Sequence, residues 1–246
     1  MKLRISTIVL GASMLMAGTS CIKKDNYPGP NASLSGSLFL DGSSSKTTVQ
    51  TSTGNFSIRL EELSYSATPA PQDIPVKNDG TYENDKLFSG HYRVSLHGGA
   101  FWPVAPVEAD IRQGSRLDFQ LTPYLLLNNF KATLTDTVLA LTADLSAPID
   151  GGVPQLIEID PYVNTTEFVG PGAAVYQFSE SQKLSVPSSS SPWDWSTMTP
   201  AQKSIGVTVT GLIRGRTFFV RLGVKFNNDD KSSNLSEVIR VDVPKQ

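Results

Sequence analysis

Short apolar runs, separated by clusters of Gly, Pro, Asn and Asp, recur along this 246-residue chain and constrain its fold most strongly. Residues 55–63 are typical, because Phe56, Ile58 and Leu60 alternate with polar residues. Such alternation predicts a β-strand with one buried face. Patterns with the period of a helix are scarce, so the sequence predicts an all-β chain.

The runs form two sets of about seven, a number typical of a β-sandwich. The first set lies within residues 32–124, with strands expected at 34–40, 47–50, 55–63, 74–77, two within 79–98, 107–111 and 117–121. The second lies within 125–246, with strands expected at 130–134, 138–145, 156–163, 183–186, 205–209, 218–226 and 238–243. Pro123 cannot donate to a sheet ladder, which suits a boundary at Thr122-Pro123-Tyr124. We therefore expect two tandem Ig-like or prealbumin-like β-sandwiches.

Helices are expected at two places only. Residues 197–204 predict one turn, with Thr199 as the cap and Pro200 at the first helical position. A weaker pattern covers residues 172–181. Residues 187–200 predict a long loop.

The N-terminus has the pattern of a bacterial lipoprotein signal. Lys2 and Arg4 precede an apolar stretch over residues 5–16, and small residues then lead to Cys21. That stretch is too short to cross ~30 Å of hydrocarbon as a helix. We expect residues 1–20 to be a signal peptide, Cys21 to be acylated, and residues 21–31 to be a lipidated tether.

Cys21 is the only cysteine, so no intramolecular disulfide can form. Two or three acyl chains on one cysteine anchor a protein stably, at ~0.8 kcal/mol per buried CH₂. The signal therefore predicts a location on a membrane surface outside the cytoplasm.

Composition argues against several classes of function. The 21 basic and 23 acidic residues form no basic patch, which argues against nucleic acid as a partner. Hydrolase, metalloprotease and phosphate-binding motifs are absent from the sequence, so we expect no enzyme and no cofactor. A hydrolase with paired carboxylates remains the weakest of three hypotheses.

Metal sites are not expected. His91 and His97 bracket one expected strand, about 20 Å apart at ~3.3 Å per residue, and so could not share a metal ion. Asn84-Asp85 and the Asn/Asp run at 227–230 offer oxygen ligands, but turn formation explains both more simply.

Three tryptophans, Trp102, Trp193 and Trp195, are the candidate carbohydrate-binding residues. Aromatic faces stack on pyranose rings while polar neighbours bind the hydroxyls. Trp193 and Trp195 would share one side if their loop is extended. The alternative is that all three close a sandwich core or fill the seam between domains. Exposed, coplanar Trp193 and Trp195 would favour binding, and burial of both would favour a scaffolding role.

Several motifs carry a resemblance to known families. Asp79-Gly80-Thr81-Tyr82 and the Leu87–Tyr92 segment resemble the transthyretin-like, carboxypeptidase-regulatory-type sandwich, where Asp-Gly forms the turn and the later glycine permits a tight reversal. Residues 207–243 resemble a fibronectin type III-like sandwich. Over residues 21–246, the segment CIKKDNYPGPN and the motif LTPY are similar to two-domain Bacteroidetes outer-membrane lipoproteins of uncharacterised function.

The resemblance implies a location in the outer membrane, beside SusC/SusD-type glycan-uptake systems. Only Asp25 supplies an acidic residue just after the cysteine, behind Lys23 and Lys24, so the cell-surface and periplasmic leaflets both stay open. The leading hypothesis is a non-catalytic accessory or glycan-binding lipoprotein of a polysaccharide utilisation system. Its expected partners are the membrane, a polysaccharide and a SusC/SusD-type complex. The alternative is a scaffolding lipoprotein that contacts only protein partners.

Overall fold

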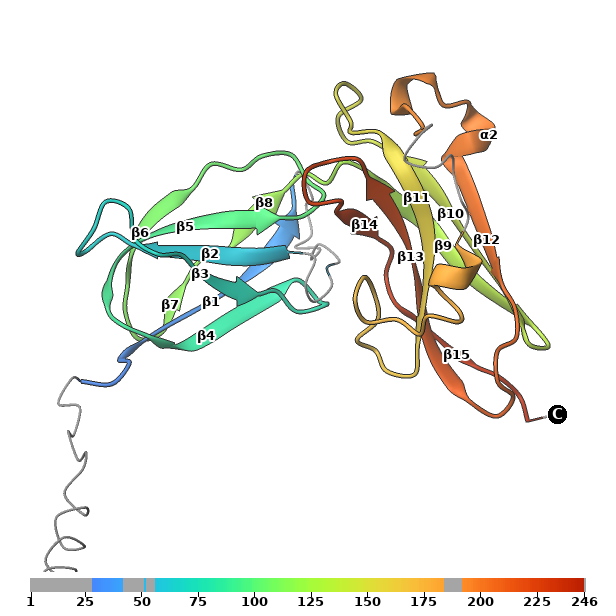
Figure 1. Ribbon diagram of the computed structural model, residues 1–246, viewed down its shortest axis with the longest axis horizontal. Coiled ribbons are helices and arrows are strands. Elements are labelled where there is room, and N and C mark those ends of the chain that lie inside the picture. Colours follow the sequence, from blue (N-terminus) through green and yellow to red (C-terminus); the bar gives the residue numbers. More distant parts are fainter. Residues whose placement is uncertain (1–27, 42–50, 52–55, 184–191, 246) are drawn as a thin grey trace, which may run out of the picture.

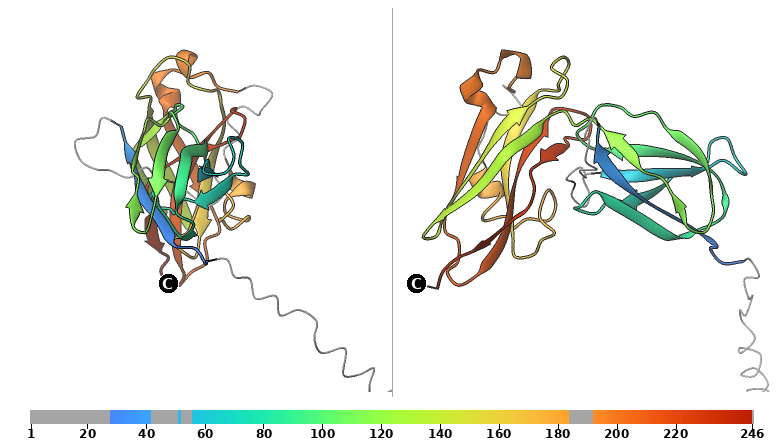
Figure 2. Two further views of the ribbon diagram at one scale, coloured as in Figure 1. Left: turned by 90° about the vertical axis from the view of Figure 1, so that its left-hand side faces the viewer. Right: turned by 180° about the vertical axis from the view of Figure 1, so that it is seen from behind.

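The computed structural model describes residues 28–41, 51, 56–183 and 192–245. In this part of the chain the strands form four sheets, which pack in pairs into two β-sandwiches (Figure 1). The two sandwiches lie one after the other along the long axis of the molecule (Figure 2). The predicted all-β fold is confirmed.

The N-terminal sandwich consists of two four-stranded sheets. One sheet has the order β4-β1-β7, with β8 also paired to β1, and comprises β1 (Ala32–Leu40), β4 (Thr81–Leu87), β7 (Ser115–Arg116) and β8 (Phe119–Leu121). The other has the order β3-β2-β5-β6 and comprises β2 (Phe56–Glu62), β3 (Gln72–Pro75), β5 (Gly90–Gly98) and β6 (Val107–Ile111).

Alternation along the strands explains this packing. Phe56, Ile58 and Leu60 on β2 are buried in one core with Leu34 and Leu38 of β1. Each fully buried side chain of this kind contributes about 1.5–3 kcal/mol relative to an exposed one. The polar residues between them face outward, and this leaves the outer face of the β3-β2-β5-β6 sheet to charged groups.

Two glycines of the 79–92 segment act differently from one another. Gly80 has a φ of 78°, as predicted for the Asp-Gly turn, and Thr81 donates its N–H to the Asp79 carboxylate at 3.0 Å. Gly90 is needed for space instead, because a Cβ there would lie 2.7 Å from Glu62 Oε1 and 2.8 Å from Ser64 Oγ. Gly90 directly follows the two-residue connection between β4 and β5, and close packing against the end of β2 is what requires glycine there.

The C-terminal sandwich has the same construction. The sheet β12-β10-β9 comprises β9 (Leu126–Thr135), β10 (Val138–Ser146) and β12 (Ser204–Val209). The opposite sheet has the order β11-β13-β14, with β15 also paired to β13, and comprises β11 (Leu156–Asn164), β13 (Thr217–Phe226), β14 (Ser233–Leu235) and β15 (Ile239–Asp242). Leu139, Leu141, Ile159 and Leu222 are buried between them.

The helical elements are short: η1 (Glu180–Gln182), η2 (Trp195–Thr197) and α2 (Pro200–Lys203). Thr199 and Gln202 form the capping box of α2, with Pro200 at its start, as predicted. The weaker helix expected over 172–181 is mostly turns, followed by η1. The expected strand at 47–50 and residues 184–186 of another lie outside the described residues. No helix in the described part of the chain is long and apolar enough to cross a membrane.

The chain passes from one core to the other between Leu121 and Leu125. Asn234 of β14 holds this connecting segment in place through two hydrogen bonds. Its Nδ2 donates to the Ala100 carbonyl at 2.7 Å, and its Oδ1 accepts from the Leu125 N–H at 2.8 Å. On the other side of the seam, Asn78 Nδ2 donates to the Glu167 carbonyl at 3.1 Å. The two domains are therefore joined by hydrogen bonds as well as by the chain.

Candidate functional site

A candidate site lies where the ends of β2 and β5 meet the loop between β13 and β14. Two adjoining cavities of about 370 and 280 Å³ share Gly98 and Asp230 as lining residues. Figure 1 shows the β13–β14 loop reaching toward the N-terminal domain at this point. We call the pair of cavities the junction groove, lined by Phe56, Ser57, Asp73, Pro75, Leu96, His97, Gly98, Gly99, Phe101, Pro103, Val104, Tyr124, Asn228, Asp229 and Asp230.

A glycine pair at the end of β5 shapes the floor of the junction groove. Gly98 and Gly99 both have positive φ angles, of 76° and 95°. A Cβ on Gly99 would lie 2.1 Å from the Phe101 ring, so only glycine lets that ring fold back here. Phe101 then packs edge-on against Phe56, with ring centroids 4.9 Å apart.

The opposite wall is the β13–β14 loop. Asn228 holds it, because its Oδ1 accepts from the Ser232 N–H at 2.9 Å and its Nδ2 donates to Ser232 Oγ at 2.7 Å. The same Nδ2 reaches the Gly99 carbonyl at 3.4 Å and so ties the loop to the first domain. This asparagine therefore serves turn formation, and no group of three metal-binding side chains occurs among the residues described.

Tyr124 closes one end of the junction groove. Its ring packs edge-on between Trp102, at 5.5 Å, and Phe226, at 5.3 Å. Burial, and then the charge of Asp230, raise the pKa of its hydroxyl. Trp102, the first predicted sugar-binding residue, is half-buried behind Tyr124 and supports the groove rather than lining it.

The charge of the junction groove is one-sided. Its described lining residues include Asp73, Asp229 and Asp230, and no Lys or Arg. Arg59 donates two hydrogen bonds of 2.8 Å to Asp73 from outside the lining, and this lowers the pKa of that carboxyl. Within the described chain the Asp230 carboxylate makes no hydrogen bond or ion pair, so it is available to a ligand.

Trp193 and Trp195 lie elsewhere, in the C-terminal domain. Trp195 is 4% exposed, its Nε1 donates to Asp150 at 3.4 Å, and Lys203 Nζ lies 3.9 Å from its ring centroid. Trp193 is half-buried against the same core, and its backbone pairs with Leu156. The stretch is not extended, because η2 begins at Trp195. The two rings therefore form no exposed platform, and the proposed sugar contact of these tryptophans stays a prediction.

A second interdomain cavity, of about 440 Å³, lies between the β3–β4 turn and the loop after β11. Lys77 and Arg240 line it together with Asp79 and Glu167, so it carries both signs of charge. Phe168 projects from this wall and is 59% exposed. The mixed charge suits a different ligand from the one that the junction groove fits.

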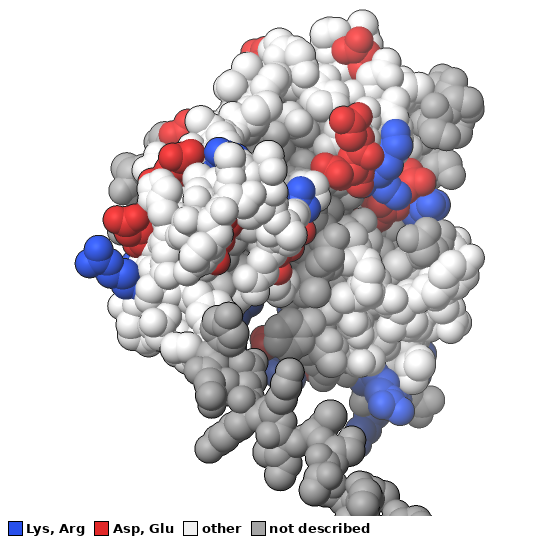
Figure 3. Space-filling model, turned by 60° about the vertical axis from the view of Figure 1, so that its left-hand side comes forward, with Lys and Arg blue, Asp and Glu red and all other residues white. Residues whose placement is uncertain are grey.

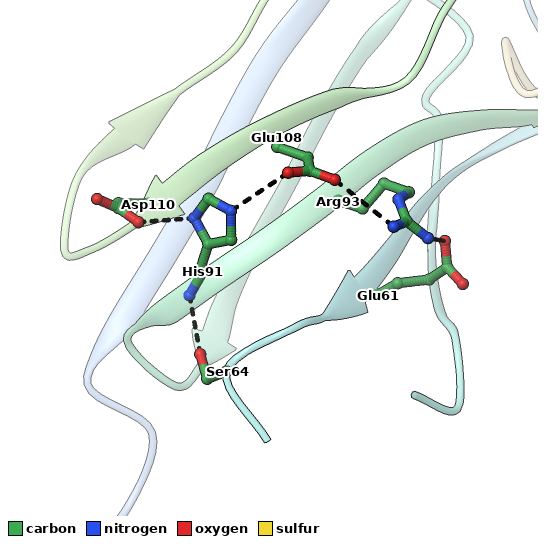
Figure 4. Close-up of polar contacts among 6 residues, drawn as sticks. All are labelled: Glu61, Ser64, His91, Arg93, Glu108 and Asp110. Carbon is green, nitrogen blue, oxygen red and sulfur yellow. Dashed lines mark hydrogen bonds and ion pairs between the residues drawn. The ribbon is translucent and has the colours of Figure 1, made fainter. Parts of the chain in front are cut away.

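Charged side chains also gather on the outer face of the β3-β2-β5-β6 sheet. His91 lies between two carboxylates of β6, with Nδ1 2.9 Å from Asp110 Oδ1 and Nε2 3.5 Å from Glu108 Oε2 (Figure 4). Arg93 links Glu108 to Glu61 along the same face. Asp110 and then Glu108 raise the pKa of His91. The two carboxylates bind opposite ring nitrogens, so these three groups cannot meet at one metal ion. His97, as predicted, is too far along β5 to join them.

A further cluster lies on β11 beneath the surface of the C-terminal domain. Glu158 binds Lys183 and Lys225, each at 3.0 Å. Asp160 beside it is 4% exposed. Tyr162 donates to its Oδ2 at 3.2 Å, and its Oδ1 has no hydrogen-bond partner among the residues that the structure describes. Burial, and then the charge of Glu158, raise the pKa of Asp160 to about 6. None of the three cavities described above is lined by Glu158 or Asp160, and we interpret this cluster as a structural feature.

Replacement of Asp160 by asparagine is expected to change the pH dependence of stability. The raised pKa means that the folded state holds the proton more tightly than the unfolded state does. The contribution of protonated Asp160 to the free energy of unfolding is therefore fully present below pH ~4 and is lost as the pH rises through about 6. The Asn variant should be about 2–3 kcal/mol more stable than the wild type at pH 7 and equal to it near pH 4, by urea unfolding. Parallel pH profiles for the two proteins would contradict this assignment.

Residues 32–122 match the DUF3823 N-terminal domain. That domain is described as one of unknown function, and it corresponds to the N-terminal sandwich. No curated protein matches the chain. The matched N-terminal sandwich supplies one wall of the junction groove, and the C-terminal sandwich supplies the other.

Solved structures resemble both domains together. A DUF3823 family protein from Bacteroides uniformis has a TM-score of 0.73 at 20% identity, over 87% of this chain and 100% of the other. A second Bacteroides uniformis protein, described as a "putative carbohydrate binding protein", has a TM-score of 0.70 at 20% identity over the same shares. A DUF3823 family protein from Parabacteroides merdae has a TM-score of 0.66 at 16% identity, again over 87% and 100%. These likenesses show a common two-domain fold.

Proposed function

We propose that this protein is a non-catalytic outer-membrane lipoprotein that binds a neutral glycan in the junction groove, as an accessory component of a polysaccharide utilisation system. The observation that carries the proposal is the groove itself. It combines aromatic rings with the carboxylates of Asp229 and Asp230, which make no ion pair within the described chain, in a concave site between domains, where small-ligand sites commonly occur. The name of one Bacteroides uniformis structure points the same way.

The chemistry of the lining supports the choice of a neutral ligand. Carboxylates at Asp229 and Asp230 accept hydrogen bonds from sugar hydroxyls, and Phe101 and Tyr124 offer apolar surface to C–H groups. Uronates and sulfated sugars would bring a second negative charge into a groove without Lys or Arg among its described lining residues. Neutral polysaccharides are therefore the expected ligands.

One observation favours the scaffolding alternative. Trp195 is buried and Trp193 is packed against the core, so neither presents a free ring to a sugar. In this second candidate function the same lipoprotein contacts only protein partners of a SusC/SusD-type complex. Co-purification of that complex with a protein that binds no glycan would favour it.

Replacement of Asp230 by alanine is expected to weaken glycan binding about 10–100-fold, because a hydrogen bond to a charged group is worth about 1.5–3 kcal/mol. The measurement is isothermal titration calorimetry of the purified mature protein with neutral glucans and mannans, and with polygalacturonate as the anionic comparison. Since Asp230 makes no hydrogen bond in the described structure, the thermal midpoint should not change.

Phe168→Ala, in the second interdomain cavity, is the matched control and should bind like the wild type. If Phe168→Ala abolishes binding and Asp230→Ala does not, a glycan binds but the junction groove is the wrong place. If no neutral glycan binds the wild type, the glycan proposal is wrong and the scaffolding function takes its place.

A further inference from the structure

Two large aromatic side chains project into solvent at one end of the N-terminal domain. Tyr65, in the β2–β3 loop, is 89% exposed, and Phe88, in the β4–β5 turn, is 50% exposed. By contrast, Phe56, Tyr82 and Tyr92 of the same domain are buried. Exposure of two such rings to water is unfavourable in free energy, so a role for them is sought in the residues around them.

The two loops that carry these rings lie side by side. Tyr92 donates its hydroxyl to the Phe88 carbonyl at 2.9 Å. The start of the β2–β3 loop is fastened to the same place, because Leu63 donates its N–H to the His91 carbonyl at 2.7 Å and Ser64 Oγ accepts from the His91 N–H at 3.0 Å. The rings therefore belong to one tip of the domain.

The chain enters the fold at this same tip. Asn31 donates its N–H to the Leu87 carbonyl at 2.9 Å, and its Oδ1 accepts from Ser89 N at 2.8 Å and Ser89 Oγ at 3.0 Å. The last residue before β1 is thus fixed directly beside Phe88. Nine residues lie between it and Cys21 in the sequence. The ten steps from one Cα atom to the next, at no more than ~3.6 Å each, span at most about 36 Å.

The composition of the tip is unusual for a water-exposed end. The β2–β3 loop, residues 63–71, reads LSYSATPAP and has no charged side chain, and neither has the turn Phe88-Ser89. Arg112, on the adjoining β6–β7 turn, is exposed. The nearest charges on β4, Asp85 and Lys86, pair with each other at 3.6 Å. Figure 3 shows acidic and basic side chains gathered in patches that are separated by uncharged surface.

We propose that this tip, made of residues 63–71, Phe88-Ser89 and Arg112, seats in the headgroup layer of the membrane that holds Cys21. Aromatic rings with polar neighbours suit that layer, and an exposed arginine suits its phosphates. The inference rests on the acylation of Cys21 in the proposed function, and it adds an orientation. The N-terminal domain is oriented with this tip toward the membrane, and the C-terminal domain lies on the side away from the lipid.

The test uses the single cysteine of the chain. In the acylated protein an introduced cysteine is the sole free thiol, so Tyr65→Cys and Phe88→Cys can each carry an environment-sensitive nitrobenzoxadiazole (NBD) dye. Ile213→Cys is the matched control, because Ile213 is 54% exposed on the connection between β12 and β13 in the other domain. Each labelled protein is reconstituted into phosphatidylethanolamine and phosphatidylglycerol vesicles with or without nitroxide-labelled lipid.

We expect dyes at positions 65 and 88 to shift to the blue and to be quenched several-fold more strongly than the dye at 213. Equal, weak quenching at all three positions on protein that floats with the vesicles would overturn the tip contact and leave the lipid anchor intact. Protein that fails to float with the vesicles would overturn the anchor, and the tip contact with it. A Tyr65→Ser/Phe88→Ser variant should still float, because the acyl chains remain.

Discussion

Replacement of Arg221 by alanine is expected to lower the free energy of unfolding by about 3–5 kcal/mol. Arg221, on β13, is fully buried, and burial lowers its pKa to about 10, so it is still a cation at neutral pH. Its described partners are backbone carbonyls: Ser236 at 3.0 and 2.6 Å, Thr51 at 2.8 Å and Val169 at 3.3 Å.

The physical reason is the loss of several partners at once. Each buried carbonyl left without a donor costs about 1–3 kcal/mol, and the truncated side chain leaves a cavity. Thr51 precedes β2 and its N–H binds the Asn78 carbonyl, so the guanidinium also joins the two domains. We expect unfolding of the variant to separate into two transitions, one for each sandwich.

Urea unfolding followed by circular dichroism measures this effect. Arg93→Ala is the matched control, because Arg93 is a partly exposed arginine in surface ion pairs and should cost under about 1 kcal/mol. Arg221→Met keeps much of the apolar stem without the donors. If Arg221→Met is as stable as the wild type, the hydrogen bonds contribute nothing and the proposed explanation is wrong.

Replacement of Cys21 by alanine is expected to release the protein from membranes completely. Two or three acyl chains bury many CH₂ groups at ~0.8 kcal/mol each, so their loss removes the proposed anchor. The measurement is the partition between soluble and membrane fractions after washing with high salt and carbonate. Lys245→Ala should remain in the membrane fraction. Retention of the alanine variant at Cys21 would show that the anchor is elsewhere.

Much of the fold followed from local pattern alone. The alternation of residues 55–63 and 138–145 predicted β2 and β10 closely, and Thr199 with Pro200 predicted the start of α2. In these segments a strand or cap depends on neighbouring residues only. Residues 172–181 were misjudged because the backbone there turns to hydrogen-bond with β11 instead, as Val175 N–H does with the Val163 carbonyl.

The candidate site was much less predictable. Phe56, Phe101, Tyr124 and Asp230 come from four distant segments, and no local pattern reports that they share a groove. Two signals were nevertheless present: the glycine pair at 98–99 before an aromatic residue, and the Asn/Asp run at 227–230, considered only as a turn or calcium loop. Trp195 was misleading because a loop tryptophan looks the same in sequence whether it faces solvent or a core.

The hydrogen bonds across the domain seam have one more consequence. Arg221, Asn234, Asn228 and Asn78 each bind main-chain atoms of the other domain or of the crossing segment. Main-chain atoms are present whatever side chain is attached to them. Most residues at the seam can therefore be substituted without loss of the hydrogen bonds between the domains. Two sandwiches docked in this way can keep their mutual arrangement while sequences diverge, and the loops around the junction groove are then open to selection for different ligands.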